Sequence, residues 1–450
     1  MSKLTKELKE EIIKRKLEGL PDEEIGKRYG ITFKQLERII TEYYGVNISK
    51  IEKKKIKYWE PKDFCEEFTT VWSFKRRGDW ATHDGRYRGN WSPYIPRNII
   101  LKYSKQGDTV LDYFVGGGTT AVEAKLLGRK CIAIDINPWA IELTRKNLDF
   151  KLPERLFKFK IYEPEVKVGD ARNLSDIPDE SIDLICAHPP YGGIISYSLN
   201  LEGDLSKLSL DEYLEEMKKV AEESFRVLKK GAKCAILIGD TRKRKYVVPI
   251  GFKVINLFLK AGFLLKELII KRQHNCKTTG FWYEKSIKQN FLLLAHEYLP
   301  VFEKPEKDVK IRPEFEKYSI ESINPGKEFD KMETTSVWIF DKEEYDDRIK
   351  FNLAQRYGKV ILVRGFNDLL QQELDKILET EKFSFLAIKV KDTRKNGYII
   401  PMGKFVVENI NNDRLKLKEI VILVKEGEII KPNDDLQIIH EYLLIYERKD

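Results

Sequence analysis

The fold is decided by the stretch Val110-Leu111-Asp112-Tyr113-Phe114-Val115-Gly116-Gly117-Gly118-Thr119-Thr120. A short apolar run leads into three consecutive glycines, and a helical pattern begins at Thr119. Glycines between a strand and a helix let the backbone turn sharply and come close to a ligand. The stretch therefore predicts a ligand-binding turn, although a plain turn is the alternative when a glycine run is taken alone.

On both sides of this stretch, short β-branched runs alternate with amphipathic helical stretches from Thr109 to about Ile238. The predicted strands are residues 109–114, 130–136, 181–187 and 233–239, and the predicted helices are residues 119–128, 138–148 and 209–230. Strands that alternate with helices are typical of a doubly wound, Rossmann-like parallel sheet in an α/β protein.

Three carboxylates follow successive predicted strands. Asp112 lies in the first predicted strand, Asp135 stands 23 residues later at the end of the second, and Asp170 follows one further apparent strand, which precedes residues 181–187. A carboxylate at the end of the second strand can accept both ribose hydroxyls of an adenosine, and the third can contact the adenine. Each aspartate alone fits a helix cap or a turn equally well, but three in this order favour a nucleoside site.

A second motif is the run Asp183-Leu184-Ile185-Cys186-Ala187-His188-Pro189-Pro190-Tyr191, in which a strand leads directly into two prolines and an aromatic residue. Two prolines fix an extended turn and leave its carbonyls as acceptors. The Pro189 carbonyl and the His188 ring can grip an amine, and Tyr191 can stack on a base. The alternative is a rigid turn that closes a buried strand.

These two motifs together resemble the amino-methyltransferases of DNA, in which an Asp-Pro-Phe-x-Gly-x-Gly-Thr loop is paired with Asp, Asn or Ser before Pro-Pro-Tyr. Residues 90–109 are similar to the segment that precedes the loop in that family, and the likeness spans about Trp91 to Pro300. The resemblance implies transfer of a methyl group from S-adenosylmethionine to the N6 of adenine or the N4 of cytosine in a flipped base of double-stranded DNA.

The resemblance also assigns roles to residues. The methionine end of the cofactor would meet Asp112 and the turn, the ribose Asp135, and the adenine Asp170. The cofactor-binding set is Asp112, Phe114, Gly116, Gly118, Thr119, Asp135 and Asp170, and the catalytic set is His188, Pro189, Pro190 and Tyr191. Tyr113 stands where the family has proline. His188 replaces Asp, Asn or Ser, so the usual guide to adenine or cytosine is missing.

The N-terminal residues predict a helix-turn-helix between Leu20 and Ile40, with Gly30 at the turn and Thr32 as the cap of the second helix. The second helix would then lie in the major groove of DNA. The side chains expected to contact DNA there are Lys34, Gln35 and Arg38. An ordinary helical hairpin is the alternative.

The C-terminal part carries an internal repeat. Asp240-Thr241-Arg242-Lys243 and the following Tyr246 to Gly251 recur, with the same spacing, as Asp392-Thr393-Arg394-Lys395 and Tyr398 to Gly403. His296-Glu297-Tyr298-Leu299 likewise recurs from His440. The second copy has neither a glycine loop nor Pro-Pro-Tyr, so we expect a degenerate half-repeat of the sheet. It would act as an internal pseudo-dimer partner that braces the DNA, with a homodimer as the alternative.

These patterns divide the chain into five predicted segments. They are a helix-turn-helix-like segment (1–48), a basic linker (49–89), the catalytic domain (90–305), a second linker (306–336) and the degenerate repeat (337–450). Target recognition is expected after the catalytic strand, in residues 271–282, where cations, an amide and aromatics are mixed. The DNA contacts predicted there are Arg272, His274, Asn275 and Lys277. Residues 75–97 contain a similar mixture of cationic, polar and aromatic side chains.

Composition limits the class of protein. The 450 residues include 81 Lys and Arg against 72 Asp and Glu, a net charge of +9, which suits a polyanionic partner or the charged surface of a heat-adapted protein. Without a run long enough to cross a membrane and without a signal peptide, we expect a cytoplasmic protein. The five cysteines are scattered, so neither a metal site nor a disulfide framework is predicted.

Other functions remain open at this stage. A cytosine-C5 enzyme needs a cysteine nucleophile, conventionally after proline, and no cysteine here follows a proline. An RNA guanine-N2 methyltransferase has a similar Pro-Pro-Tyr turn and is the second candidate, which Gly192 fits. A DNA-binding regulator with a relic methyltransferase fold is the third. The sequence does not say whether a restriction enzyme accompanies the protein.

Overall fold

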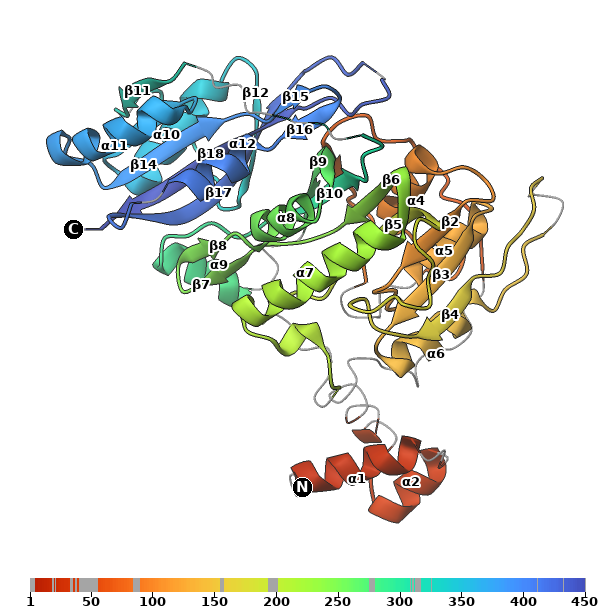
Figure 1. Cartoon of the computed structure of the whole chain (residues 1–450). Coiled ribbons are helices and arrows are strands. Elements are labelled where there is room, and N and C mark those ends of the chain that lie inside the picture. The colour runs from red at the N-terminus through yellow and green to blue at the C-terminus, as the bar shows by residue number, and fades with distance from the viewer. Residues whose placement is uncertain are drawn as a thin grey trace. The chain divides into compact units, whose positions relative to one another are not determined.

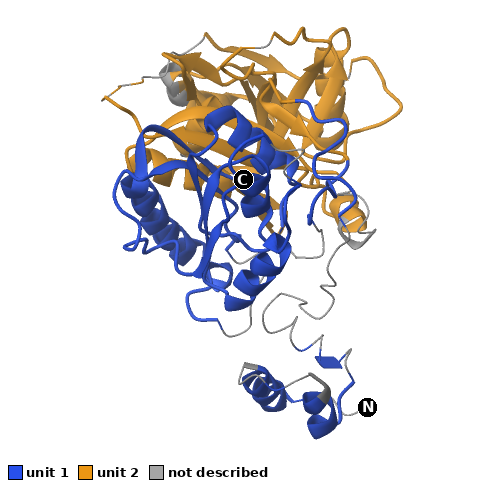
Figure 2. Ribbon diagram, turned by 90° about the vertical axis from the view of Figure 1, so that its right-hand side faces the viewer, with its two compact units in different colours: residues 1–65, 76–236 blue, residues 66–75, 237–450 orange. Residues whose placement is uncertain are grey.

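The computed structural model of the chain consists of two compact units (Figure 2). Unit 1 comprises residues 1–65 and 76–236, and unit 2 comprises residues 66–75 and 237–450. The structure describes residues 5–17, 20, 22–32, 35–36, 39, 56–83, 90–153, 158–192, 201–274, 280–307, 309, 311, 317–324, 326–410, 412–431 and 433–449. The boundary at residue 236 divides the segment 90–305, and the five predicted segment bounds stay predictions.

Unit 1 is built on a parallel sheet with the strand order β6-β5-β2-β3-β4 (Figure 1). Its strands are β2 (Thr109–Asp112), β3 (Lys130–Asp135), β4 (Glu165–Val168), β5 (Ile182–Ala187) and β6 (Leu228–Ile236). Its helices are α1 (Lys6–Leu17), α2 (Asp22–Tyr29), α4 (Tyr94–Tyr103), α5 (Thr119–Leu126), α6 (Pro138–Leu148), α7 (Leu210–Val227) and the 3-10 turn η2 (Leu205–Lys207). This sheet confirms the predicted doubly wound α/β fold.

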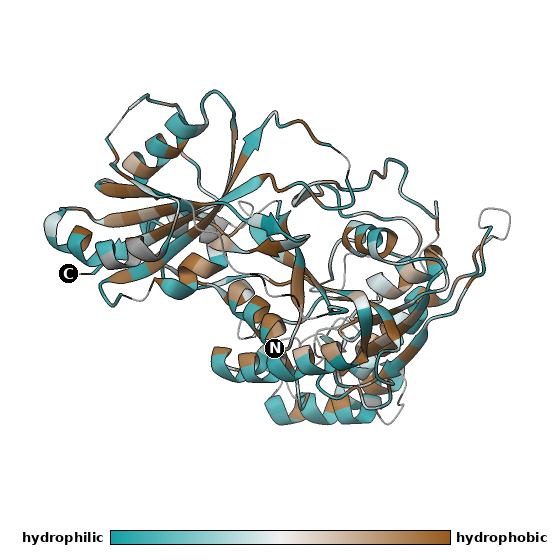
Figure 3. Cartoon of the chain, turned by 45° about the horizontal axis from the view of Figure 1, so that its top comes forward, coloured by the Kyte–Doolittle hydropathy of each residue, from teal (hydrophilic) through white to brown (hydrophobic). Residues whose placement is uncertain are grey.

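Local sequence signals explain where these elements begin. Helix α7 starts at Leu210 because the Ser209 side chain accepts from the Glu212 amide while the Glu212 carboxylate accepts from the Ser209 amide, which is a capping box. Helix α6 starts after Asn137, whose side chain accepts from the Trp139 amide. The strands are the most hydrophobic ribbons, whereas the helices carry polar faces (Figure 3). Strand β6 begins at Leu228 and not near Lys233 as predicted. Lys229, Lys230 and Gly231 follow Leu228, and these residues interrupt the apolar pattern by which a strand is recognised.

The strand order places a topological switch point between β2 and β5. From β2 the chain proceeds to β3 and β4 on one side, whereas β5 continues to β6 on the other. Val110 pairs with Leu184 and Leu111 with Ile185. In open α/β sheets a ligand crevice forms outside the carboxyl ends of the strands at this point. The glycine turn and the proline turn therefore emerge side by side.

The N-terminal helices of unit 1 bury a small core of their own. It consists of Ile12, Ile13, Ile25, Ile31, Leu36 and Ile39. Gly30 lies at the turn with φ +61°, and Thr32 caps the following segment through the Gln35 amide, as predicted. The Gln35 side-chain oxygen accepts from the Thr32 amide and hydroxyl, at 2.8 and 2.9 Å. Lys34 and Arg38 lie outside the described residues.

Unit 2 contains two groups of strands. In one, β1 (Val71–Ser73) is parallel to β9 (Leu264–Arg272), which is antiparallel to β10 (His296–Glu303). The other is a six-stranded sheet with the order β11-β13-β14-β18-β17-β12. Its strands are β11 (Ser319–Ser322), β12 (Val337–Asp341), β13 (Val360–Arg364), β14 (Phe385–Val390), β17 (Leu415–Glu426) and β18 (His440–Arg448).

The remaining elements of unit 2 are two short hairpins and five helices among the described residues. The hairpins pair β7 (Thr241–Lys243) with β8 (Tyr246–Val248) and β15 (Thr393–Lys395) with β16 (Tyr398–Ile400). The helices are α8 (Ile250–Lys260), α9 (Gly280–Lys288), α10 (Tyr345–Tyr357), α11 (Asp368–Thr380) and α12 (Met402–Asn409).

The predicted repeat is visible in the topology of unit 2. Strand β12 is parallel to β17 and β17 antiparallel to β18, just as β1 is parallel to β9 and β9 antiparallel to β10. The repeat also reaches a segment that the sequence analysis missed. Trp72 donates to the Thr69 carbonyl and Trp338 to the Thr335 carbonyl, both at 2.9 Å.

The two copies contact each other reciprocally. Arg242 of the first copy donates to Glu419 of the second at 2.6 Å, and Arg394 of the second donates to Glu267 of the first at 2.5 Å. Thr70 lies 2.8 Å from the His440 ring. The matching pair is Ser336 and His296, also 2.8 Å apart. Residue pairs that exchange places in this way are the signature of a two-fold interface.

We expect loss of either arginine to destabilise the protein strongly. Arg242→Met or Arg394→Met leaves the carboxylate of Glu419 or Glu267, each 0% exposed, without its cation. Breaking a buried pair costs about 3–5 kcal/mol, so the free energy of unfolding in urea should fall by that amount. As a control, Lys327→Met removes the cation of an exposed pair with Glu344 and should cost less than about 1 kcal/mol. Equal losses in all three variants would contradict this interpretation.

Candidate active site

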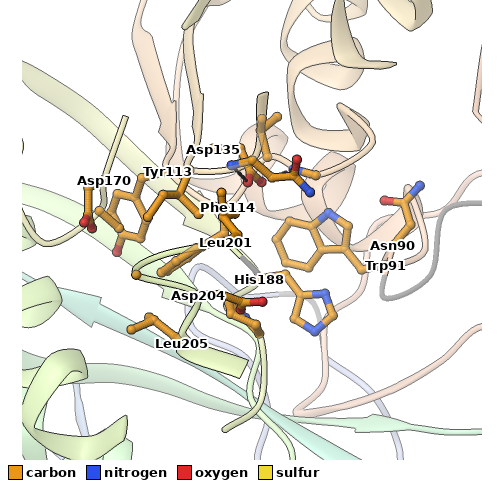
Figure 4. A pocket seen from close by; sticks show the side chains of 17 residues that line it. Asn90, Trp91, Tyr113, Phe114, Asp135, Asp170, His188, Leu201, Asp204 and Leu205 are labelled. Carbon is orange, nitrogen blue, oxygen red and sulfur yellow. Dashed lines mark hydrogen bonds between the residues drawn. The ribbon is translucent and has the colours of Figure 1, made fainter. Parts of the chain in front are cut away.

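A pocket opens at the carboxyl ends of the unit 1 strands (Figure 4). It holds about 800 Å³ of space, part of which is open to solvent. Its walls come from the segments that follow β2, β3, β4 and β5 and from two further loops. The lining residues are Asn90, Trp91, Tyr113–Gly116, Asp135–Asn137, Asp170, Ala171, His188, Pro190, Leu201 and Gly203–Leu205.

The glycine turn is held by several hydrogen bonds. The Gly116 amide donates to the Asp135 carboxylate at 2.9 Å, and the Gly116 carbonyl accepts from the Thr144 hydroxyl at 2.9 Å. Gly118 has φ +86°, and a Cβ there would lie 3.0 Å from the Thr144 side chain. A side chain at Gly118 would thus be strained and would push helix α6 away. The glycines are required by the backbone as well as by the ligand.

Burial changes the ionisation of the two aspartates behind and beside this turn. It raises the pKa of the Asp112 carboxyl to about 7, although the nearby Thr120 hydroxyl and the hydrogen bond from the Phe114 amide oppose the rise. It raises the pKa of Asp135 to about 6, against the bonds from the Asn137 and Gly116 amides, and the charge of Asp204 adds to the effect. A buried cation would stabilise both carboxylates.

Asp170, on the opposite side of the pocket from His188 in Figure 4, differs from these two. Burial alone would raise its pKa, but hydrogen bonds and charge from Arg172 outweigh burial and lower the pKa below the ordinary value. The Arg172 guanidinium donates three hydrogen bonds to the Asp170 carboxylate, at 2.6, 2.9 and 3.0 Å. Asp170 is therefore a fixed, ionised hydrogen-bond acceptor on the pocket wall.

The proline turn places an aromatic cluster on the other wall. The His188 ring stacks on Trp91, with ring centroids 5.6 Å apart and an interplanar angle of 24°. The His188 Nε2 atom lies 3.0 Å from the Tyr191 hydroxyl. His188 and Pro190 line the pocket, whereas Pro189 and Tyr191 are not among its lining residues. The two predicted motifs thus meet at one pocket.

Six of the predicted site residues line the pocket, namely Phe114, Gly116, Asp135, Asp170, His188 and Pro190. Asp112 and Thr119 lie behind the wall. The Asp112 carboxylate accepts from the Phe114 amide at 3.0 Å, and the Thr119 hydroxyl donates to the Asn90 side chain. Both therefore position lining residues.

Of the predicted DNA-contacting residues, the structure describes Gln35, Arg272 and His274, and none of these three lines this pocket. Arg272 ends β9 in unit 2, and the His274 ring lies 3.0 Å from the Ser73 hydroxyl. Burial and the neighbouring Arg272, Lys271 and Lys75 charges lower the pKa of His274. Asn275 and Lys277 lie outside the described residues.

Sequence reasoning missed the network that holds the segment before the turn. The Glu123 carboxylate, fully buried in α5, accepts from Trp80 at 2.7 Å and from Arg97 at 2.9 Å, and lies 2.6 Å from the His83 ring. This network joins Trp80 and His83 to Arg97, which follows the lining residue Trp91 by six positions. The sequence did offer one sign of this network, because Glu123 lies in a helix whose other residues are mostly small or apolar.

Asp204 and Asn137 were also missed. Both line the pocket and both cap helices. Asp204 accepts from the Ser206 amide at 2.9 Å, and Asn137 accepts from the Trp139 amide at 3.0 Å. Capping residues are common in sequences, so nothing local marked them. In the described part of the chain, no cluster of three or more His, Cys, Asp or Glu side chains is arranged to hold a metal ion. Nor does any described helix have the apolar length needed to cross a membrane.

The pocket suits S-adenosylmethionine, whose sulfonium and ammonium groups are cations. Asp112 is a buried and Asp135 a half-buried carboxylate whose raised pKa values a cation would lower, and Asp170 offers an ionised acceptor. Trp91 and Phe114 supply aromatic surface for a sulfonium or a base. At the switch point of a doubly wound sheet, this pocket is that of a methyltransferase that uses S-adenosylmethionine as its cofactor.

Comparison with known families gives the same class. The family described as DNA methylase matches residues 7–146 and 182–360, which is more than half of the chain. The chain belongs to this family, the amino-methyltransferases of DNA. A second family, described as RNA cap guanine-N2 methyltransferase, matches residues 107–236.

Individual relatives match shorter parts. A tRNA (guanine(10)-N2)-dimethyltransferase of Methanothermobacter thermautotrophicus is 35% identical over 29% of this chain and 34% of its own length. The type II methyltransferase M2.DpnII of Streptococcus pneumoniae is 35% identical over 21% of this chain and 38% of its own length. The chain thus spans little more than a third of these relatives. A solved S-adenosylmethionine-dependent methyltransferase of Methanosarcina mazei is 17% identical, with a TM-score of 0.33 over 46% of this chain and 98% of that one.

We expect cofactor affinity to depend on pH. Asp112 and Asp135, with pKa values of about 7 and about 6, are ionised above pH 8 and protonated below pH 5. A protonated carboxyl no longer attracts a cation, so affinity for S-adenosylmethionine should fall at least about tenfold from pH 8 to pH 5 in calorimetric titrations. Asp135→Asn should weaken binding at pH 8 and flatten the profile.

The matched control for this titration is Asp170→Asn. Because Arg172 keeps Asp170 ionised, this variant should lose affinity at every pH and keep the slope of the wild-type profile. A wild-type profile that is flat between pH 8 and pH 5 would exclude Asp112 and Asp135 from cofactor binding.

Proposed function

We propose that this chain transfers the methyl group of S-adenosylmethionine to an exocyclic amino nitrogen of adenine or cytosine in DNA. The observation that carries the proposal is the shared pocket of the glycine turn and the His188-Pro189-Pro190-Tyr191 turn. When bound, the cofactor supplies an electrophilic methyl group. What the chain itself must supply is a grip on the amine and a binding surface for the base.

The amine needs acceptors because its lone pair is delocalised into the base ring. Acceptors that bind its two hydrogens turn the nitrogen toward a tetrahedral geometry, in which the lone pair becomes available. We assign this role to the His188 ring and the Pro189 carbonyl. The first proline fixes the turn and cannot move its carbonyl away by rotation about φ.

A histidine accepts only in the right tautomer. Its Nε2 lies 3.0 Å from the Tyr191 hydroxyl. If Nε2–H donates to this hydroxyl, the acceptor lone pair of the ring is on Nδ1. Tyr191 would then set the tautomer of His188, and the Trp91 ring, stacked on the imidazole, would hold its plane. Base stacking, the role first assigned to Tyr191, would be shared with Trp91.

An RNA guanine-N2 methyltransferase is the second proposal, and two observations favour it. The second family match covers residues 107–236, and a tRNA guanine-N2 enzyme is among the relatives. Gly192 does not distinguish the two, because a Cβ there would lie 2.6 Å from the Tyr213 ring. Packing alone therefore demands glycine at this position.

Product analysis separates these proposals. The full chain is incubated with labelled S-adenosylmethionine and either mixed-sequence duplex DNA or transfer RNA, and the nucleosides are resolved by mass spectrometry. We expect N6-methyladenine or N4-methylcytosine from the DNA. N2-methylguanine from the RNA would favour the second proposal. Cofactor binding without any methylated nucleoside would favour a DNA-binding regulator.

Substitution of His188 tests its acceptor role. His188→Ala should lower kcat about a hundredfold, because one partner of the amine is lost. The wild-type rate should fall toward pH 5 as the ring takes a proton. His188→Asn keeps an acceptor oxygen that does not titrate, so its kcat at saturating S-adenosylmethionine should be restored in part and be flat over this range. Affinity for S-adenosylmethionine, measured in parallel, should change less than about threefold in both variants. A flat wild-type profile would remove His188 from the role.

A further inference from the structure

The second copy has its own pocket at the carboxyl ends of two parallel strands. Strand β13 is parallel to β14, as β5 is parallel to β6. Asp392-Thr393-Arg394-Lys395 follows β14 as Asp240-Thr241-Arg242-Lys243 follows β6. By this equivalence, Gly365 after β13 takes the place of His188 after β5. The pocket in unit 2 therefore lies at strand ends that correspond, within the repeat, to those of β5 and β6.

The chemistry of this second pocket is different. Its lining includes four cationic side chains and one carboxylate, namely Lys317, Arg364, Lys389, Lys391 and Glu441. Ser319 and Thr393 add hydroxyl groups. It encloses about 700 Å³, including space open to solvent. Where the first copy has His188, Pro189 and Pro190, the second copy thus has a pocket with a net positive charge.

Part of this charge is held by neighbouring carboxylates. Lys389 lies 3.0 Å from Glu441, and Arg364 lies 2.9 Å from Asp346. These pairs fix two cations on the pocket wall. Lys317 and Lys391 are exposed and form no ion pair with any described residue, so their charge is available to a ligand.

A buried hydroxyl gives an independent indication of a ligand. Thr393 is half-buried and lines the pocket, and its Oγ1 atom, which is closed off from solvent, has no hydrogen-bond partner among the described residues. A buried polar group without a partner is costly in a folded protein, unless a ligand or a water satisfies it. A hydroxyl donor among lysines suits a phosphate oxygen, which accepts from both.

We propose that this pocket, at the ends of β13 and β14, binds a phosphate group of a nucleic-acid backbone. The inference rests on the proposed function, which gives the chain a nucleic-acid substrate. The exposed lysines Lys317 and Lys391 favour a backbone over a small free anion, because they can reach phosphates outside the pocket. The degenerate copy has then exchanged methyl transfer for a role in holding the substrate.

The test compares two double variants of the full chain. Lys317→Gln with Lys391→Gln removes the unpaired charge of the pocket. The control is Lys359→Gln with Lys382→Gln, which removes the same charge from two exposed positions. These positions lie just before the amino-terminal ends of β13 and β14, whereas the pocket lies at their carboxyl ends. Affinity for a short duplex DNA is measured by fluorescence anisotropy between about 50 and 200 mM salt. Affinity for inorganic pyrophosphate is measured by calorimetry.

The pocket variant should bind duplex DNA about tenfold more weakly, and the slope of log affinity against log salt should fall by about two. The control should change less than about twofold. Unchanged DNA affinity in the pocket variant, or equal losses in both variants, would overturn the proposal. Loss of pyrophosphate binding with unchanged DNA affinity would overturn it too, and would assign the pocket to a free phosphate.

These outcomes do not depend on catalysis. If no methylated nucleoside is found but the pocket variant still loses DNA affinity, the proposed function fails and the phosphate site stands. If DNA is methylated and both variants bind it as the wild type does, the phosphate site fails alone. Cofactor affinity should be unchanged in both variants, since neither substitutes a residue of the unit 1 pocket.

Discussion

The parallel pairing of β2 with β5 is the constraint on which the catalytic unit depends. Val110 lies beside Leu184 and Leu111 beside Ile185, so the glycine turn and the proline turn both begin at the carboxyl ends of these neighbouring strands. These turns are 70 residues apart in the sequence, since Gly118 precedes His188 by that distance. Neither turn could form a pocket alone. The sheet contributes no reactive group, but it decides that a cofactor site and an acceptor site face each other.

Local patterns were sufficient for the elements and the two turns, but not for their supports. The strands and helices around Asp112 and Asp135 follow hydrophobic periodicity and capping signals that a few residues carry. The buried Glu123, by contrast, meets Trp80 and Arg97 only after folding. The raised pKa of Asp135 depends likewise on burial, which no short pattern specifies.

The repeat shows the same limit. Its later half could be predicted from two short sequence motifs that recur in the same order. The short β1 segment could not, because its equivalence to β12 is visible only when the β1–β9 pairing is compared with the β12–β17 pairing. The reciprocal Arg242–Glu419 and Arg394–Glu267 pairs join residues 177 and 127 positions apart. Symmetry between copies is a property of the folded chain. It also gives the second copy a structural reason to persist after its motifs have been lost.

The insertion of residues 66–75 into unit 2 affects how the chain can be made. Strand β1 leaves the ribosome early, yet its partner β9 begins only at Leu264, and Thr70 meets His440 across 370 positions. Loop closure over such distances is slow, and domains tend to form as they emerge. We therefore expect the second unit to remain incomplete until the segment that holds His440 has been made. A chain released early would carry an unpaired edge strand, which is a known route to aggregation.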